Sequence, residues 1–204
     1  MYLYTVNYHE INRTNLIKFM NNLKLVILCL LLVMASGCKK YPNNANGQKI
    51  PNGDFEQWNS WPVLINWHTN SCPLCMGPYK QYVVVKDSLA YHGKYAAKFI
   101  FNGIYKSWAQ NKFAISKHPD LLTGYIYSKV TAGDTAKISI DIFYKKQIVD
   151  SGKLYVTSSI TNYKEFEIPI TNNSLKSDSA EINVTGGEKL NTELTIDYLT
   201  LIKK

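Results

Sequence analysis

The sequence lacks any long apolar run and has almost no arginine. No hydrophobic stretch in its 204 residues approaches the roughly 18 that a membrane-spanning helix needs, which excludes a polytopic membrane protein. Arg13 is its only arginine. Because bidentate recognition of phosphate and guanine uses the planar arginine fork, nucleic acid is not expected as a partner. With 46% hydrophobic and 19% charged residues, the chain is predicted to form one packed globular domain.

The N-terminal segment carries a predicted export signal. Residues 25–34 are a run of ten apolar residues that follows Lys18 and Lys24. This pattern is typical of a secretory signal peptide, and the polar stretch before Met20 is then an upstream extension. The small residues 35–37 together with Cys38 resemble a bacterial lipoprotein cleavage box. We therefore expect cleavage before Cys38 and a lipid on its thiol, which makes the anchor the only membrane contact.

The predicted organisation has three parts: residues 1–37 are the extension and signal peptide, 38–47 a lipidated tether, and 48–204 the folded domain. Cleavage removes one arginine, two lysines and one glutamate, so the net charge falls from +8 to +6. The remaining basic residues are 20 scattered lysines, which predict a solvated surface, with anionic glycans or lipid headgroups as alternative partners. Lys39 and Lys40 differ from an acidic surface-export signal, so an outer-membrane lipoprotein facing the periplasm is expected rather than one on the cell surface.

Cys72 and Cys75 are the cysteines left for folding, because Cys29 leaves with the signal peptide and Cys38 carries the lipid. In an oxidising compartment they are predicted to form a disulfide that braces a loop. A thioredoxin-like role fits less well, since Gly77 and Pro78 stand where the active-site helix would begin. The further alternative is a zinc site, with ligands drawn from His68, Cys72, Cys75 and either His92 or His118.

The region after residue 80 consists of short runs typical of β-strands. The period of two is clearest where Ile138, Ile140 and Ile142 share one face. Turn formers separate the runs, among them Gly93, Gly133 and the pair Ser151-Gly152. No helical stripe intervenes, which favours an all-β, two-sheet antiparallel sandwich over a closed barrel or an α/β fold. The predicted strands are residues 82–86, 95–101, 105–115, 124–130, 137–144, 153–159, 165–170, 179–184 and 192–202.

Three segments resemble the galactose-binding-like jelly rolls of carbohydrate-binding modules and of many lipoproteins of the Bacteroidetes type. Residues 50–58 (IPNGDFEQW) match their N-G-x-F-E-x-W opening, and Trp67 matches the tryptophan that follows it. Residues 87–98 resemble the Gly-containing entry into the next β segment, and residues 194–201 the closing strand with its acidic residue. Residues 119–127 are similar to a segment of carbohydrate-metabolism lipoproteins of the same group.

The resemblance implies a structural calcium ion near the opening motif and the last strand. Hard oxygen ligands suit Ca²⁺, and the carboxylates at the matching places are Glu56, Asp197 and Asp54, with Asp87 as a fourth. The alternative is that these are surface carboxylates paired with lysines.

The resemblance also implies that sugars stack on exposed aromatic rings. Trp58 and Trp67 occupy positions that are core in the family, whereas other aromatic residues are candidates for the sugar platform. These candidates are Trp61, Trp108, Tyr105, Tyr125 and Tyr127. An aromatic stripe inside the sandwich is the alternative interpretation.

The function favoured by these observations is a lipid-anchored, non-catalytic binding module of the cell envelope, with carbohydrate as the expected ligand. An alternative is a glycoside-active domain that uses Asp54 and Glu56, because side chains two residues apart on a strand share one face. A third is a structural or adhesive envelope protein that binds another protein.

Overall fold

The computed structural model describes residues 47–77, 81–172 and 175–204. The expected signal peptide (residues 1–37), Cys38 and almost all of the tether (38–47) lie outside the described residues. Within the described ranges, no helix is long and apolar enough to cross a membrane.

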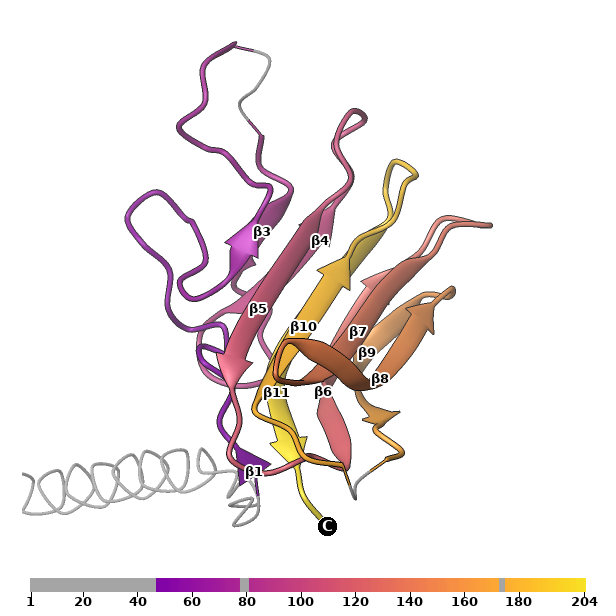
Figure 1. The fold of residues 1–204 in the computed structure, drawn as a ribbon. Coiled ribbons are helices and arrows are strands. Elements are labelled where there is room, and N and C mark those ends of the chain that lie inside the picture. Colours follow the sequence, from indigo (N-terminus) through magenta and orange to yellow (C-terminus); the bar gives the residue numbers. More distant parts are fainter. Residues whose placement is uncertain (1–46, 78–80, 173–174) are drawn as a thin grey trace, which may run out of the picture. The chain divides into compact units, whose positions relative to one another are not determined.

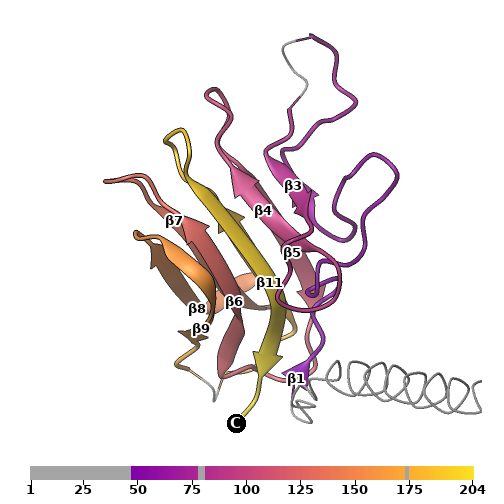
Figure 2. The same cartoon turned by 180° about the vertical axis from the view of Figure 1, so that it is seen from behind.

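The domain is a sandwich of two antiparallel sheets (Figures 1 and 2), as the sequence predicted. Sheet I has the order β3-β4-β11-β6-β9, with β1 paired to β11, and sheet II has the order β2-β5-β10-β7-β8. The strands are β1 (Gly47–Gln48), β2 (His68–Thr69), β3 (Val84–Asp87), β4 (Ala96–Ile100), β5 (Trp108–Ala114), β6 (Leu121–Lys129), β7 (Ala136–Tyr144), β8 (Gln147–Val156), β9 (Ile160–Pro169), β10 (Ser179–Thr185) and β11 (Glu193–Ile202).

Alternating apolar side chains form the core between the sheets. Ile138, Ile140 and Ile142 of β7 are fully buried, as their period of two predicted. Phe55 and Trp67 of the opening segment pack together with ring centroids 5.3 Å apart. The Trp67 ring is buried, which confirms that this tryptophan belongs to the core.

In the last strand the alternation of buried and exposed side chains shifts by one residue, which the sequence did not predict. A regular strand would place Tyr198 on the same face as Leu194 and Ile196, but β11 has a bulge between Asp197 and Thr200. Tyr198 adopts a positive φ of 53° there, and Leu199 is buried in its place. A bulge shifts the phase by one residue, which is why the pattern expectation was wrong at this position.

The predicted turn at Ser151-Gly152 is also wrong, because both residues lie inside β8. The turn is made instead by Lys145 and Lys146, both with positive φ, between β7 and β8. Gly152 is needed for a different reason. A Cβ atom at this position would lie 2.7 Å from the Pro169 carbonyl oxygen of sheet I, so glycine permits the two sheets to approach closely at this edge.

Candidate functional site

The outer face of sheet I is covered by the chain itself. Segment 88–95, which joins β3 to β4, lies over this face and is held by two carboxylates. Asp197 Oδ2 accepts the main-chain N–H groups of Tyr91 and His92, both at 2.8 Å. Glu56 Oε1 accepts those of Lys94 at 2.7 Å and Tyr95 at 2.9 Å. Glu56 of the opening motif and Asp197 of the closing strand therefore hold segment 88–95 in place.

Tyrosine rings complete this cover. Tyr91 stacks on Tyr125 of β6, with ring centroids 3.4 Å apart and an interplanar angle of 11°. Tyr163 of β9 lies against Tyr91 and Tyr127, and its hydroxyl donates to the Leu89 carbonyl at 2.6 Å. Burial raises the pKa of both Tyr125 and Tyr163. Tyr125 and Tyr127, two candidates for a sugar platform, thus pack within the cover of sheet I.

The covered site holds the carboxylates expected to bind calcium. Asp197 is fully buried, and burial raises its pKa to about 7 even though three main-chain N–H donors favour the charged form. The Glu56 carboxylate raises this pKa further by repulsion. Carboxylates are the ligand type that Ca²⁺ prefers, and both oxygens of Asp197 and Oε1 of Glu56 already accept main-chain N–H groups.

The other two expected ligands have different surroundings. Asp87 Oδ2 forms an ion pair with Lys98 Nζ at 2.6 Å, which is the lysine pairing that the alternative interpretation anticipated. Asp54 Oδ1 is buried and has no hydrogen-bond partner among the described residues. No group of three or more His, Cys, Asp or Glu side chains suited to a metal ion occurs in the described part of the chain.

The outer face of sheet II is open, and three rows of side chains cross it. Strand pairing places Trp108, Thr185, Lys137 and Tyr155 directly beside one another on β5, β10, β7 and β8. We call this set the aromatic row. Its two ring-bearing ends are three strands apart, or about 14 Å. Trp108 is 37% exposed and Tyr155 54% exposed, so both rings are accessible.

The second row supplies hydrogen-bonding groups. It contains Gln110, Asn183, Ser139 and Lys153, with His68 of β2 beside Gln110. Gln110 Nε2 donates to Glu181 Oε1 at 2.8 Å and to Asn183 Oδ1 at 3.1 Å. The His68 ring lies 5.7 Å from the Trp108 ring. Amides held in place by one another next to an aromatic ring are suited to orienting a polyhydroxylated ligand.

The third row is acidic at its centre. Glu181 and Asp141 face each other across β10 and β7, and Lys112 Nζ lies 3.5 Å from Glu181 Oε2. Burial raises the pKa of Asp141, and the Glu181 carboxylate raises it further, whereas Lys137 lowers it. Negative charge on this face is thus concentrated two rows away from the aromatic row.

Two hollows lie beside these rows. One, of about 480 Å³, is lined by Trp67, His68, Gln110 and Lys112, beside the second and third rows. The other, of about 420 Å³, is lined by Lys137, Tyr155 and Thr185 of the aromatic row and by loop residues that include Asp134 and Glu188. The Tyr155 end of the aromatic row therefore borders a hollow.

The remaining aromatic candidates lie in loops. Trp61 is 56% exposed in the loop closed by the Trp58–Leu64 bridge, where its main-chain N–H donates to Asn59 Oδ1 at 2.9 Å. Tyr105 lies in the β4–β5 loop, because β5 begins only at Trp108. The structure thus brings Trp108 onto an open face, places Tyr125 and Tyr127 on the other sheet, and leaves Trp61 and Tyr105 outside both.

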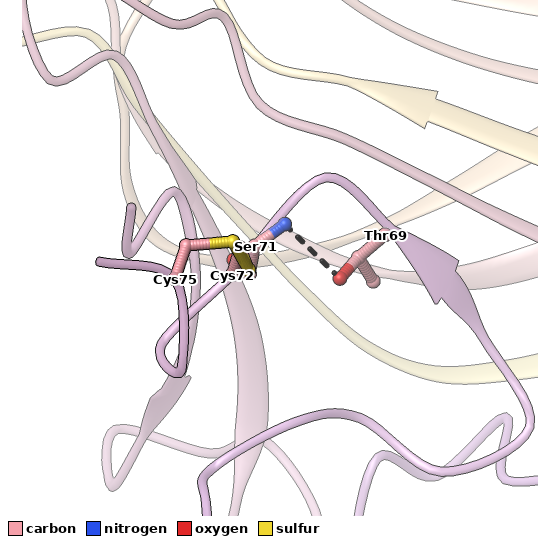
Figure 3. Close-up of a disulfide and its surroundings, with 4 residues drawn as sticks. All are labelled: Thr69, Ser71, Cys72 and Cys75. Atoms are coloured by element: carbon pink, nitrogen blue, oxygen red, sulfur yellow. Dashed lines mark hydrogen bonds between the residues drawn. A yellow bond between two sulfur atoms is a disulfide. The ribbon is translucent and has the colours of Figure 1, made fainter. Parts of the chain in front are cut away.

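Cys72 and Cys75 form a disulfide in the loop after β2 (Figure 3). Ser71 beside them donates its N–H to Thr69 Oγ1 at 3.3 Å and receives the N–H of Val84 on its hydroxyl at 2.7 Å. The bridge therefore closes a loop that is attached to β3. Of the histidines considered as zinc ligands, His118 is buried 3.8 Å from Asp150 and His92 packs against Tyr198.

Sequence reasoning missed most of the open face. Tyr155, Asn183 and Glu181 were not singled out, although each occupies an outward position of a strand with a period of two. That alternation was the available signal. It shows that a residue points away from the core, but not which residues of other strands lie beside it.

The chain matches no protein-family model and no curated protein. Its fold is similar to that of solved β-sandwich carbohydrate-binding modules. The structure of TmCBM61 in complex with β-1,4-galactotriose aligns with a TM-score of 0.54 at 15% identity, covering 78% of this chain and 99% of that one. A candidate glycoside hydrolase from Bacteroides thetaiotaomicron aligns with a TM-score of 0.51 at 10% identity, covering 78% and 70%. The enzymatically active domain of tailspike protein 4 of bacteriophage CBA120 aligns with a TM-score of 0.50 at 15% identity, covering 75% and 21%.

Proposed function

We propose that this protein is a non-catalytic carbohydrate-binding module whose ligand lies across the outer face of sheet II. The observation that carries the proposal is the aromatic row, in which Trp108 and Tyr155 present accessible rings on one face of sheet II, on strands about 14 Å apart. Sugar rings present apolar C–H faces that stack on such aromatic surfaces. Hydroxyl groups along the same sugar chain can reach the amides of Gln110 and Asn183 in the second row.

The fold supports this class of ligand. The similar module TmCBM61 was solved with β-1,4-galactotriose, an oligosaccharide. The alternative of a glycoside-active pair at Asp54 and Glu56 is less well supported, since Glu56 already accepts two main-chain N–H groups. The Glu56 Oε1 atom is therefore occupied by main-chain N–H groups and is not directed at a substrate.

The proposal includes attachment to the outer membrane through a lipid on Cys38, facing the periplasm. β1, which begins the described part, pairs with the end of β11, while the loop before β11 carries Glu188 of the second hollow. In Figure 1, β1 and the C-terminus lie at the same end of the sandwich. The loop between β10 and β11 lies at the opposite end of the sandwich from β1 (Figure 1).

Affinity gels containing plant, host and bacterial polysaccharides test the binding. We expect retention by at least one polysaccharide, and a loss of affinity of about tenfold or more for Trp108→Ala and for Tyr155→Ala, as is usual for aromatic anchors. Tyr82→Ala is the matched control, because Tyr82 is an exposed aromatic residue just before β3 of sheet I. Unchanged retention of both row variants would exclude this face. No retention on any glycan, with co-purification of a stable protein partner, would instead favour the adhesive role.

We also propose that a calcium ion, held by Glu56 and Asp197, stabilises segment 88–95. The ion would supply only positive charge between two carboxylates, and the chain's own N–H groups would continue to fix their orientation. Calcium at about 100 times its Kd would add about 2.7 kcal/mol to the free energy of unfolding. Thermal unfolding in calcium and then in chelator should show this difference, and Glu56→Gln should remove it. An identical Tm in both solutions would contradict the calcium site.

A further inference from the structure

We propose that the β7–β8 end of the aromatic row binds an anionic sugar residue, one that carries a carboxylate or a sulfate group. This inference rests on the proposed function and specifies the class of carbohydrate. It starts from two lysines of this face, Lys137 and Lys153, and from the ring between them, Tyr155.

Lys137 stands in the aromatic row itself, between Thr185 and Tyr155. Within the described residues, no carboxylate oxygen lies within 4.0 Å of its ammonium group, whereas Lys106 and Lys112 pair with Glu188 and Glu181. A ligand that stacks on both rings of the row must pass over Lys137. The ammonium group therefore forms no ion pair within 4.0 Å, although its charge acts on the Asp141 carboxylate.

Lys153, two residues before Tyr155 on β8, places a second ammonium beside the same ring. It is paired with Ser139, which makes it a diagonal neighbour of Lys137, and its Nζ lies 5.7 Å from the Tyr155 ring centroid. Diagonal neighbours on one face of a sheet are about 7–8 Å apart, within reach of long side chains. An exocyclic anionic group of a sugar stacked on Tyr155 would thus lie within reach of both lysine side chains.

The acidic groups nearby have hydrogen-bond or ion-pair partners other than these two lysines. The Asp134 carboxylate is bound by the main-chain N–H groups of Glu188 and Lys189, and Glu188 itself pairs with Lys106. Asp141 and Glu181 lie two rows away, at the other side of the face. The two lysines therefore make this face positive beside Tyr155, whereas Asp141 and Glu181 make it negative in the third row. This separation of charge favours an anionic group at the Tyr155 end.

Matched polysaccharides that differ only in charge provide the test. Polygalacturonate and its fully methyl-esterified form share one backbone, with and without free carboxylates, and dextran sulfate and dextran do the same for sulfate. We expect at least one anionic polymer to be bound about tenfold or more tightly than its neutral partner in low salt, because hydrogen bonds to charged groups are stronger than neutral ones. The preference should fall as ionic strength rises.

Lysine variants assign the preference to this end of the face. Lys137→Gln and Lys153→Gln should each reduce the anionic preference, that is the ratio of affinities for the anionic and the neutral polymer, about three- to tenfold. Lys164→Gln removes the same charge at an exposed position of β9 in sheet I and should not change the anionic preference.

Each outcome separates this inference from the proposed function. Binding of a neutral polymer that depends on Trp108, with no anionic preference, overturns the inference and leaves the carbohydrate module in place. An anionic preference that Lys164→Gln reduces as much as Lys137→Gln shows only non-specific attraction to a basic protein and also overturns it. No binding of either kind overturns both. The difference between the carboxylate pair and the sulfate pair identifies which anion is recognised.

Discussion

Asp134 links the two loops that form the rim of the second hollow, and its replacement by asparagine should loosen that rim. The side chain is 7% exposed. Its carboxylate accepts the N–H groups of Glu188 at 3.0 Å, Lys189 at 2.8 Å and Thr135 at 2.8 Å. Asp134→Asn keeps the shape of the side chain but turns one acceptor oxygen into an NH₂ donor, which faces other donors.

The magnitude follows from the pKa of this group. Burial by itself raises the pKa of Asp134, but the N–H donors outweigh it and lower the value from 3.8 to about 2. A shift of this size corresponds to about 2 kcal/mol of folding stability. Because the folded-state pKa is depressed, this stability is present above pH 3.8 and is lost as pH falls through 2. At pH 7 we expect Asp134→Asn to lower Tm by about 4–8 °C.

Urea unfolding of the wild type and of Asp134→Asn between pH 7 and pH 2 measures this effect. The difference in unfolding free energy should be about 2 kcal/mol at pH 7 and should shrink toward zero near pH 2. Glu167→Gln, which changes an exposed carboxylate on β9, serves as the control and should show no such trend. A difference that stays constant across this pH range, or none at pH 7, would refute the role assigned to Asp134. Weaker glycan binding by Asp134→Asn is expected as well, since the two loops that border the hollow are no longer held together.

Gly93→Ala should destabilise the cover of sheet I, because Gly93 has a φ of 72° and a Cβ there would collide with the Glu56 carboxylate. Faster amide hydrogen exchange of residues 91–95 would show this effect. Unchanged exchange would contradict the role of Glu56 in holding segment 88–95. Cys72→Ser should lower the free energy of unfolding by at most about 2 kcal/mol, because the disulfide to Cys75 closes a loop of only four residues. Urea unfolding checks this, and glycan affinity should not change, since the bridge lies outside the three rows.

The fold could be predicted from the sequence to the level of its strands. The alternation in β7 and β10 places Ile138 and Ile182 in the core, because residues two apart in a strand point to the same side whatever its neighbours are. The prediction was wrong where a single residue altered the phase. Tyr198 forms the bulge in β11, and nothing in the local pattern distinguishes it from a regular strand residue.

The candidate site could be predicted only in fragments. Trp108 was predicted to be one of several candidates for a sugar platform, but its partners in the aromatic row come from three other strands. Tyr125 and Tyr127 have the same aromatic character and the same alternation. They serve a different role, since segment 88–95 happens to cover their sheet.

The sequence by itself determined the class of fold, the residues that face the core and the presence of a predicted export signal, because each depends on short-range periodicity and composition. Only the tertiary structure decided which sheet face is open and which side chains stand in one row. These properties depend on the pairing of β5, β10, β7 and β8 and on the docking of segment 88–95 by Glu56 and Asp197. Strand pairing joins residues distant in the chain through packing of the whole core, so no local pattern encodes it.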